Sequence, residues 1–331
     1  MTHPTTRLDA IDSARGIGII LVVFGHAWRG AFGAGLIPNN AVFAAIDAGI
    51  YAFHMPLFFF LSGLLFLETL GKYKTTALLK GRVTRLLWPM ALWTWVFFGF
   101  KLLGGTAVNT PVTLTDFPLV PLPPYEHLWF LWALFLCHYF LILLYAPLPR
   151  WIPQRYWRIG AGTIGLVLAY MLPNISVPSL IWGPMVAHMP YFLIGIAIGG
   201  SDNLKRGGKF TAVLGACLFL GYIGLFMAGQ PLGNPMIGSA LLLIFGWMAW
   251  PHVDNGGETR VLQGLLYLGK TSMVIYLTHT IFSATLRIAM LKIEIDSLSF
   301  ILLATTLIGL IAPLLVLAVA RRLRLTKLLG F

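Results

Sequence analysis

Charged residues are scarce in this chain. Asp, Glu, Lys and Arg together make up 10% of the 331 residues, whereas a soluble domain carries about 25%. Hydrophobic residues make up 58%, and the mean hydropathy is +0.83. This composition excludes an ordinary soluble globular domain and is typical of a membrane protein with many spanning segments.

Acidic residues and cysteines are also few. The chain has 11 acidic and 23 basic residues, which gives a formal net charge of +12. We expect no nucleic-acid partner, because the basic residues fall in short loops between apolar segments and no aromatic–basic motif accompanies them. The two cysteines, Cys137 and Cys217, both lie within apolar segments, which argues against a disulfide framework.

Hydropathy divides the chain into about ten apolar segments long enough to cross a bilayer. We therefore expect an all-α, polytopic integral membrane protein with its helices around a central polar cavity or tunnel. No internal repeat or separate soluble domain is visible, so residues 1–331 are interpreted as one domain. The predicted spans are residues 14–30, 41–68, 85–103, 127–146, 158–173, 181–199, 210–229, 235–250, 266–290 and 298–320.

The distribution of basic residues sets the expected orientation. With the N-terminus inside, the outer side keeps only Arg29, Lys101 and Lys292, with Arg287 near a span end. We therefore predict that both termini are cytoplasmic. The outer loop 104–126 contains no Lys or Arg and is rich in proline. Its sequence is compatible with a lid over the outer mouth and equally with a plain connector.

The first span carries a polar stripe. Eleven helical steps separate Arg15 from His26, about 1100° of rotation and about 16 Å of rise, so the two side chains face the same way. Asp12, three residues before Arg15, shares that face. Such residues are costly in a bilayer unless they are buried in protein and used, so we expect a functional pocket along this stripe.

Histidines recur at similar depth in other spans. His54 and His188 lie in the second and sixth spans, His279 lies in the ninth, and His127 opens the fourth. One buried histidine is most often a structural, hydrogen-bonded residue, but several at one depth indicate a shared polar cavity. No pair has the i, i+3 or i, i+4 spacing of a helical metal site, and membrane carboxylates are few. We therefore expect no metal.

Three further motifs each allow two interpretations. Ser62-Gly63 suits ligand approach or helix packing through small residues. Arg82 and Arg85, three apart, suit a phosphate or simply mark the cytoplasmic side. The Glu126-His127 pair suits an acid–base or acceptor-binding element at the outer mouth, whereas the adjacent Trp129 is also explained by an aromatic belt.

Several segments, taken in order, resemble membrane-bound acyltransferase family 3, the O-acetyltransferase family. VVFGH and FHMP are most similar to its fucose 4-O-acetylase-like branch. The segments are Asp12-x-x-Arg15-Gly16 with the ten-residue gap to His26, FHMPLFFFLSG, Arg82-x-x-Arg85, His127-Leu128-Trp129-Phe130, and YLGKTSMVIYLTH ending at His279.

The resemblance implies a multi-pass enzyme of the bacterial inner membrane. Its members move an acyl group, usually acetyl, from cytoplasmic acyl-CoA to a hydroxyl of a sugar, a surface polysaccharide, a lipid-linked glycan or a small metabolite. The family's essential first-helix arginine and histidine correspond to Arg15 and His26, and its paired arginines to Arg82 and Arg85. Acetyl-CoA is then a co-substrate, and no permanently bound cofactor is implied.

The residues fit this chemistry. We expect the three arginines and Ser62 on the acyl-CoA side, with His26 taking a proton from the acceptor or itself accepting the acyl group. Asp12 and His54 are candidate supporting groups. The expected acceptor or cavity residues are Glu126, His127, Trp129, His188 and His279. The alternative function is a proton-coupled transporter or glycan exporter without acyl transfer, for which mid-depth histidines also fit.

Overall fold

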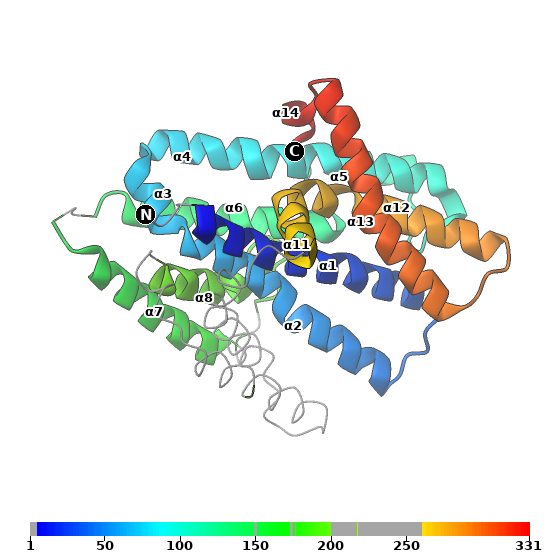
Figure 1. The fold of residues 1–331 in the computed structure, drawn as a ribbon, viewed down its shortest axis with the longest axis horizontal. Coiled ribbons are helices and arrows are strands. Elements are labelled where there is room, and N and C mark those ends of the chain that lie inside the picture. Colours follow the sequence, from blue (N-terminus) through cyan, green and yellow to red (C-terminus); the bar gives the residue numbers. More distant parts are fainter. Residues whose placement is uncertain (1–4, 149–150, 173–174, 176, 200–216, 218–259) are drawn as a thin grey trace.

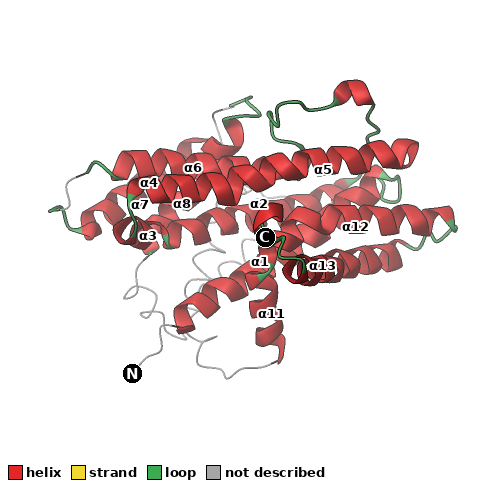
Figure 2. Cartoon of the chain, turned by 90° about the horizontal axis from the view of Figure 1, so that it is seen from above, coloured by secondary structure: helices red, strands yellow, loops and turns green. Residues whose placement is uncertain are grey.

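The chain folds as a bundle of helices, shown in Figure 1 and, from above, in Figure 2. The computed structural model describes residues 5–148, 151–172, 175, 177–199, 217 and 260–331. Two predicted spans, 210–229 and 235–250, lie outside these residues, apart from Cys217. No strand occurs in the described part of the chain, which confirms the all-α prediction.

The longer helices follow the order of the predicted spans. Their bounds are α1 (Thr5–Gly33), α2 (Ala41–Leu64), α5 (Trp88–Gly104), α6 (Trp129–Tyr145), α7 (Gln154–Met171), α8 (Gly183–Ile198), α12 (Ser272–Lys292) and α13 (Leu298–Arg322). The shorter helices are α3 (Phe66–Lys72), α4 (Thr75–Arg82), α11 (Arg260–Lys270) and α14 (Thr326–Leu329). Three 3₁₀ turns, η2 (Gly105–Ala107), η3 (Leu114–Asp116) and η4 (Glu126–Leu128), lie between α5 and α6.

Six described helical segments are long and apolar enough to cross a membrane. They match the predicted spans 14–30, 41–68, 85–103, 127–146, 266–290 and 298–320. Helix α8 is also apolar but shorter, at 16 residues. The described residues therefore establish a membrane protein with several spans, while the predicted count of ten is not confirmed.

Two predicted span boundaries were wrong. The third helical segment begins at Thr75, ten residues before the predicted start at residue 85. The reason is that α4 continues into α5 through a π-helical turn, η1 (Val83–Leu87). The two helices form one long rod in Figure 1. The ninth span is interrupted between Lys270 and Ser272. There the hydroxyl of Thr271 donates to the backbone oxygen of Tyr267 at 2.7 Å, and the helix direction changes from α11 to α12.

Helix α1 is the centre of the packing. It contacts α2, α11, α12 and α13, while α8 packs against α2, α6 and α7. The α2–α8 crossing is close because it is built on glycines: a Cβ added to Gly63 or to Gly195 would lie 3.0 Å from the Cα of the other. Small residues let membrane helices approach in this way. The arrangement surrounds one face of α1 with α2, α12 and the loop that precedes α6.

Candidate active site

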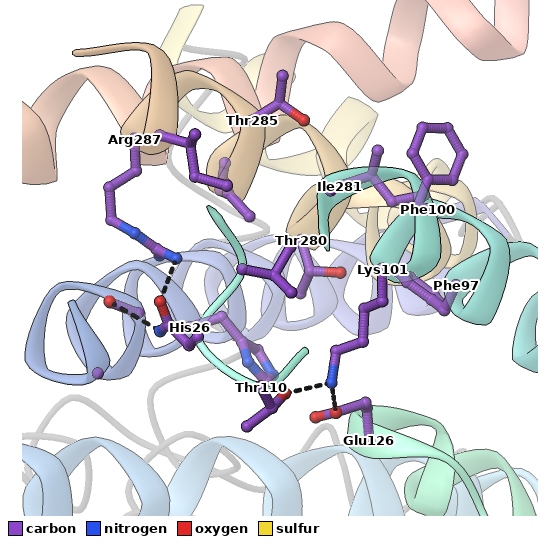
Figure 3. A pocket seen from close by; sticks show the side chains of 18 of the residues that line it. His26, Phe97, Phe100, Lys101, Thr110, Glu126, Thr280, Ile281, Thr285 and Arg287 are labelled. Carbon is purple, nitrogen blue, oxygen red and sulfur yellow. Dashed lines mark hydrogen bonds and ion pairs between the residues drawn. The ribbon is translucent and has the colours of Figure 1, made fainter. Parts of the chain in front are cut away.

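A cavity of about 580 Å³ opens beside the second half of α1 (Figure 3). His26 and His127 line it, together with residues of α5, of the outer loop and of α12. In Figure 3, Lys101 reaches toward Thr110 and Glu126 on one side, and Arg287 lies on the other. We refer to this space as the outer cavity.

Three histidine rings meet at the base of the outer cavity. The ring centroids of His26 lie 5.3 Å from His127 and 5.1 Å from His279, and the latter two are 5.3 Å apart. His127 and His279 are almost fully buried. The three come from α1, η4 and α12, so the fold brings together residues more than 100 positions apart in sequence. The structure thus places two of the predicted cavity histidines against the predicted catalytic one.

Backbone carbonyls define the protonation of two of these rings. The backbone oxygens of Ile275 and Tyr276 each lie 2.9 Å from His279 Nδ1, and that of Tyr276 lies 3.2 Å from His127 Nε2. A carbonyl only accepts hydrogen bonds, so each of these nitrogens carries the proton when the ring is neutral. The second nitrogen of each ring is then an acceptor. His279 Nε2 is buried next to His26 and has no hydrogen-bond partner in the part of the chain that the structure describes.

A smaller cavity of about 160 Å³, the inner cavity, lies beside the first half of α1. Arg15 and Ser62 are among its polar lining residues. Asp12 Oδ1 accepts a hydrogen bond from Arg15 Nη1 at 3.1 Å, which holds the guanidinium near this cavity. Ser62 donates to the backbone oxygen of Phe58 at 2.9 Å. Ser62 therefore faces the cavity, while its neighbour Gly63 serves the packing against α8.

One face of α1 lines both cavities. The inner cavity contacts Arg15, Ile19 and Val22, and the outer cavity contacts His26, Arg29, Gly30 and Gly33. Steps of three and four residues follow a single helical face. Val22 and His26 are one turn apart, about 6 Å along the axis, so the two cavities follow one another along α1. Tyr276 stands between them, because it lines the inner cavity and its hydroxyl donates to the backbone oxygen of His127, beside the outer one.

The outer cavity is lined by paired and unpaired charges. Arg29 binds both carboxylate oxygens of Asp47, at 2.7 and 2.8 Å, and its guanidinium stacks on the ring of Tyr51 at 3.2 Å. Lys101 forms an ion pair with Glu126. Glu126 has φ = 49°, a conformation uncommon for a non-glycine residue and often found at functional sites. This local geometry turns the chain so that Glu126 and His127 both face the cavity.

The outer loop forms part of the cavity wall. Val108, Asn109 and Thr110 line the cavity. Asn109 donates to the backbone oxygen of Gly30 at 3.3 Å, and Lys101 donates to Thr110 at 2.5 Å. These bonds tie the loop to α1 and α5 over the cavity, so the loop is more than a connector between spans. Whether it also opens and closes as a lid stays a prediction.

Several predicted site residues lie outside both cavities. His54 is buried, its Nδ1 is 2.5 Å from the backbone oxygen of Ile50, and its ring packs on Tyr51. His188 stacks between Phe59 and Trp129, with ring centroids at 4.7 and 5.2 Å. Neither histidine, nor Trp129, lines the inner or the outer cavity. Arg82 is half-buried and Arg85 is exposed at the π-helical turn, and both also lie outside the two cavity linings.

Three residues that line the two cavities were not predicted as site residues: Arg287, Lys101 and Tyr276. A charged residue inside or next to an apolar segment could have pointed to two of them. Arg287, for example, follows His279 by eight residues on the same helix. Lys101 and Arg287 had been used only to predict the orientation of the chain in the membrane. Among the described residues, no group of three His, Cys, Asp or Glu side chains is arranged to hold a metal ion.

The site can be compared with known proteins at this point. A family model described as an acyltransferase domain matches residues 8–320, nearly the whole chain. The chain belongs to this family. The resemblance to membrane-bound acyltransferase family 3 is thereby confirmed, while the fucose 4-O-acetylase-like branch stays a prediction.

Two curated relatives carry the same name. The chain is 27% identical to nodulation protein NolL of Mesorhizobium japonicum over 230 residues, which are 65% of this chain and 56% of the relative. It is 32% identical to nodulation protein NolL of Sinorhizobium fredii over 196 residues, which are 56% of this chain and 46% of the relative. The chain thus spans about half the length of the curated relatives it matches. No solved structure matches it significantly.

Proposed function

We propose that this chain is an acyl-CoA-dependent membrane O-acyltransferase. It transfers an acyl group, by family precedent acetyl, to a hydroxyl of a sugar, a surface or exopolysaccharide, a lipid-linked glycan or a small metabolite. The observation that carries the proposal is that one face of α1 lines two successive cavities, with Arg15 in one and His26 in the other. Two substrates entering from opposite ends then meet at His26.

The inner cavity suits the acyl donor. Coenzyme A has a phosphate-rich end and a long narrow arm that ends in the thioester. Arg15, held by Asp12, offers a guanidinium for a phosphate, and the rise of about 16 Å from Arg15 to His26 matches an extended arm. We assign Arg82 and Arg85 to the same phosphates because they correspond to the family's paired arginines. No permanently bound cofactor is needed.

The outer cavity suits the acceptor. It is larger than the inner cavity and is lined by hydroxyl, amide and charged side chains. A general base must reach the acceptor proton, and among the three clustered histidines His26 and His127 line this cavity. His26 takes the proton from the acceptor hydroxyl as the oxygen attacks the thioester carbon, the carbon–sulfur bond breaks, and coenzyme A leaves as the thiol with that proton. Alternatively, a ring nitrogen of His26 displaces coenzyme A first and then passes the acyl group to the acceptor oxygen.

Orientation follows from the basic residues. We place the Arg15 end of α1 in the cytoplasm, where acyl-CoA is found, with both termini on that side of the bacterial inner membrane. The outer cavity then faces away from the cytoplasm. An acceptor on that side is acylated without the donor leaving the cytoplasm.

The experiment is acyl transfer by the purified full chain in detergent, with isotopically labelled acetyl-CoA and lipid-linked and free glycans from the source membrane. We expect wild type to label an acceptor and His26→Ala to lose at least a hundredfold in rate, the low end for general acid–base catalysis. His138→Gln is the matched control, because His138 is a buried histidine in α6 outside both cavities. A His26→Ala enzyme with normal turnover contradicts the proposal.

The same assay separates the enzyme from the transporter. Detergent abolishes any ion gradient, so an exporter without acyl transfer consumes no acetyl-CoA. The acceptor is identified by mass spectrometry of glycans and metabolites from a deletion strain and its parent. An acetyl group present only in the parent marks the product.

A further inference from the structure

We propose that the outer cavity selects an acceptor that carries an anionic group, and that Arg287 binds that anion. The inference rests on the proposed function, since it names the class of acceptor for the same site. The anion is a carboxylate or a phosphate, the two groups that a guanidinium fork binds with parallel hydrogen bonds.

Arg287 is a buried cation that has no counter-charge among the described residues. It is 7% exposed and lines the outer cavity. Its Nη2 donates to the side-chain oxygen of Asn109 at 3.2 Å, and its Nε is buried without a partner. Within the described ranges, no carboxylate lies within 4.0 Å of it. Burying a charged group is costly unless it is paired, so the cavity is incomplete on this side without an anion.

The other two cations of the outer cavity differ from Arg287 in this respect. Arg29 is paired with Asp47, and Lys101 with Glu126. Their charges are already compensated within the protein. A negative charge that enters the cavity is therefore attracted chiefly to Arg287.

The position of Arg287 fits a substrate that reaches His26. The guanidinium lies against Gly30 of α1, because a Cβ added to Gly30 would collide with Nη1. Gly30 is one turn beyond His26, a rise of about 6 Å, close to the width of a single hexose ring. A sugar whose anion is bound by Arg287 thus presents a hydroxyl on its far side to His26.

A neutral polar side chain, that of Thr280, also lines this part of the outer cavity. The hydroxyl of Thr280 is buried and has no hydrogen-bond partner among the described residues. Thr280 lines the outer cavity and directly follows His279 in α12, seven residues before Arg287. It offers a donor and an acceptor to a sugar hydroxyl. The cavity wall therefore provides a charged contact at one end and a polar contact nearer His26.

The test measures binding of three probes to the purified full chain in detergent, without acyl donor. Methyl glucoside is neutral, methyl glucuronide carries a carboxylate, and glucose 1-phosphate carries a phosphate. We compare wild type, Arg287→Gln and Arg287→Lys. The matched control is Lys292→Gln, which removes an exposed charge from the end of the same helix.

We expect wild type and Lys292→Gln to bind at least one charged probe about 10- to 100-fold more tightly than methyl glucoside, the range for a hydrogen bond to a charged group. In Arg287→Gln this preference falls to about one, and Arg287→Lys keeps part of it. Preference for the glucuronide identifies a carboxylate on the sugar, and preference for the phosphate identifies a glycosyl phosphate.

Two results overturn the inference: no charged probe is preferred by wild type, or the preference survives in Arg287→Gln. If Arg287→Gln does not fold, the result for Arg287→Lys is used instead. An Arg287→Lys protein that prefers the charged probe over methyl glucoside as strongly as wild type does would exclude recognition by the guanidinium fork. The probe assay contains no acyl donor, so it reports anion binding alone. Failure of anion binding is thus separated from failure of acyl transfer, which only the transfer assay reports.

Discussion

Substituting Gly309 tests whether the packing of α13 against α1 and α12 holds the histidine cluster in position. Gly309 lies in α13, and an added Cβ would lie 2.5 Å from Ser283 Oγ and 2.8 Å from Val23 Cγ1, whereas ordinary contacts begin at 3.4 Å. Gly309→Ala is therefore too close by about 0.9 and 0.6 Å. Ser283 precedes Arg287 on α12 and Val23 precedes His26 on α1, so the strain falls on both helices that form the site.

The energetic cost follows from the same geometry. Overpacking a buried contact costs about 1–3 kcal/mol. Ser283 does not move away freely, since its hydroxyl donates to the backbone oxygen of Thr305 at 2.8 Å, and losing that bond costs about 1 kcal/mol. Alanine recovers about 1 kcal/mol of helix propensity. A shift of the histidine rings by a few tenths of an ångström lowers kcat by about tenfold, given that a 1 Å misplacement costs about a hundredfold.

The assay combines thermal unfolding with acyl transfer, and Gly264→Ala in α11 is the control. Nothing lies within 4 Å of a Cβ added to Gly264, so this variant gains propensity without strain. We expect Gly309→Ala to be about 1–3 kcal/mol less stable than Gly264→Ala and to lose activity. Equal stability and normal turnover of the two variants would refute the argument that α13 holds the site in place.

Two further predictions concern the two ends of the site. Arg15→Ala should raise the KM for acetyl-CoA about 10- to 100-fold, because a hydrogen bond to a charged group is lost. Arg15→Lys should give an intermediate KM. An unchanged KM in Arg15→Ala would exclude the contact between Arg15 and a phosphate. In the outer loop, the backbone N–H and the hydroxyl of Thr113 donate to Asp116 and hold the pKa of that carboxyl below its usual value. The stabilisation of the loop by the ionised Asp116 is therefore complete above about pH 4 and is lost as the pH falls through the lowered pKa. Asp116→Asn should speed amide hydrogen exchange of residues 113–117 at pH 7. Unchanged exchange in this variant would contradict the prediction.

The sequence predicted the parts of the site that depend on helical periodicity. The stripe of Arg15 and His26 needs only 3.6 residues per turn, and α1 indeed carries both residues on the face that lines the cavities. His127 and His279 were expected in a shared cavity from their depth, and their rings lie within 5.3 Å of His26. Fold class and family are likewise confirmed.

Depth in the membrane does not determine which way a side chain faces. His54 and His188 were predicted at the same depth as the other histidines, yet both pack against aromatic neighbours and neither lines either cavity. Their direction depends on how α2 and α8 rotate to bring Gly63 and Gly195 together, which no single helix encodes. The same holds for Arg287, whose place in the cavity arises from the packing of α12 on α1.

Local breaks were also beyond the sequence pattern. The π-helical turn at Val83–Leu87 lies at the start of a predicted span, and the interruption at Thr271 lies inside one. Each break depends on which backbone carbonyl accepts a hydrogen bond from a nearby side chain or from the next turn. Hydropathy carries no information about these hydrogen bonds. These breaks matter for function, because α12 begins at the interruption and carries His279 and Arg287.

Our main proposal is that the two substrates reach His26 from opposite ends of α1. It is tested most directly in proteoliposomes loaded with the acceptor that the detergent assay identifies, with labelled acetyl-CoA added only outside and His26→Ala as the blank. We expect labelled acceptor to form inside the vesicles. Acetylation that occurs only when donor and acceptor share one side of the membrane would contradict it.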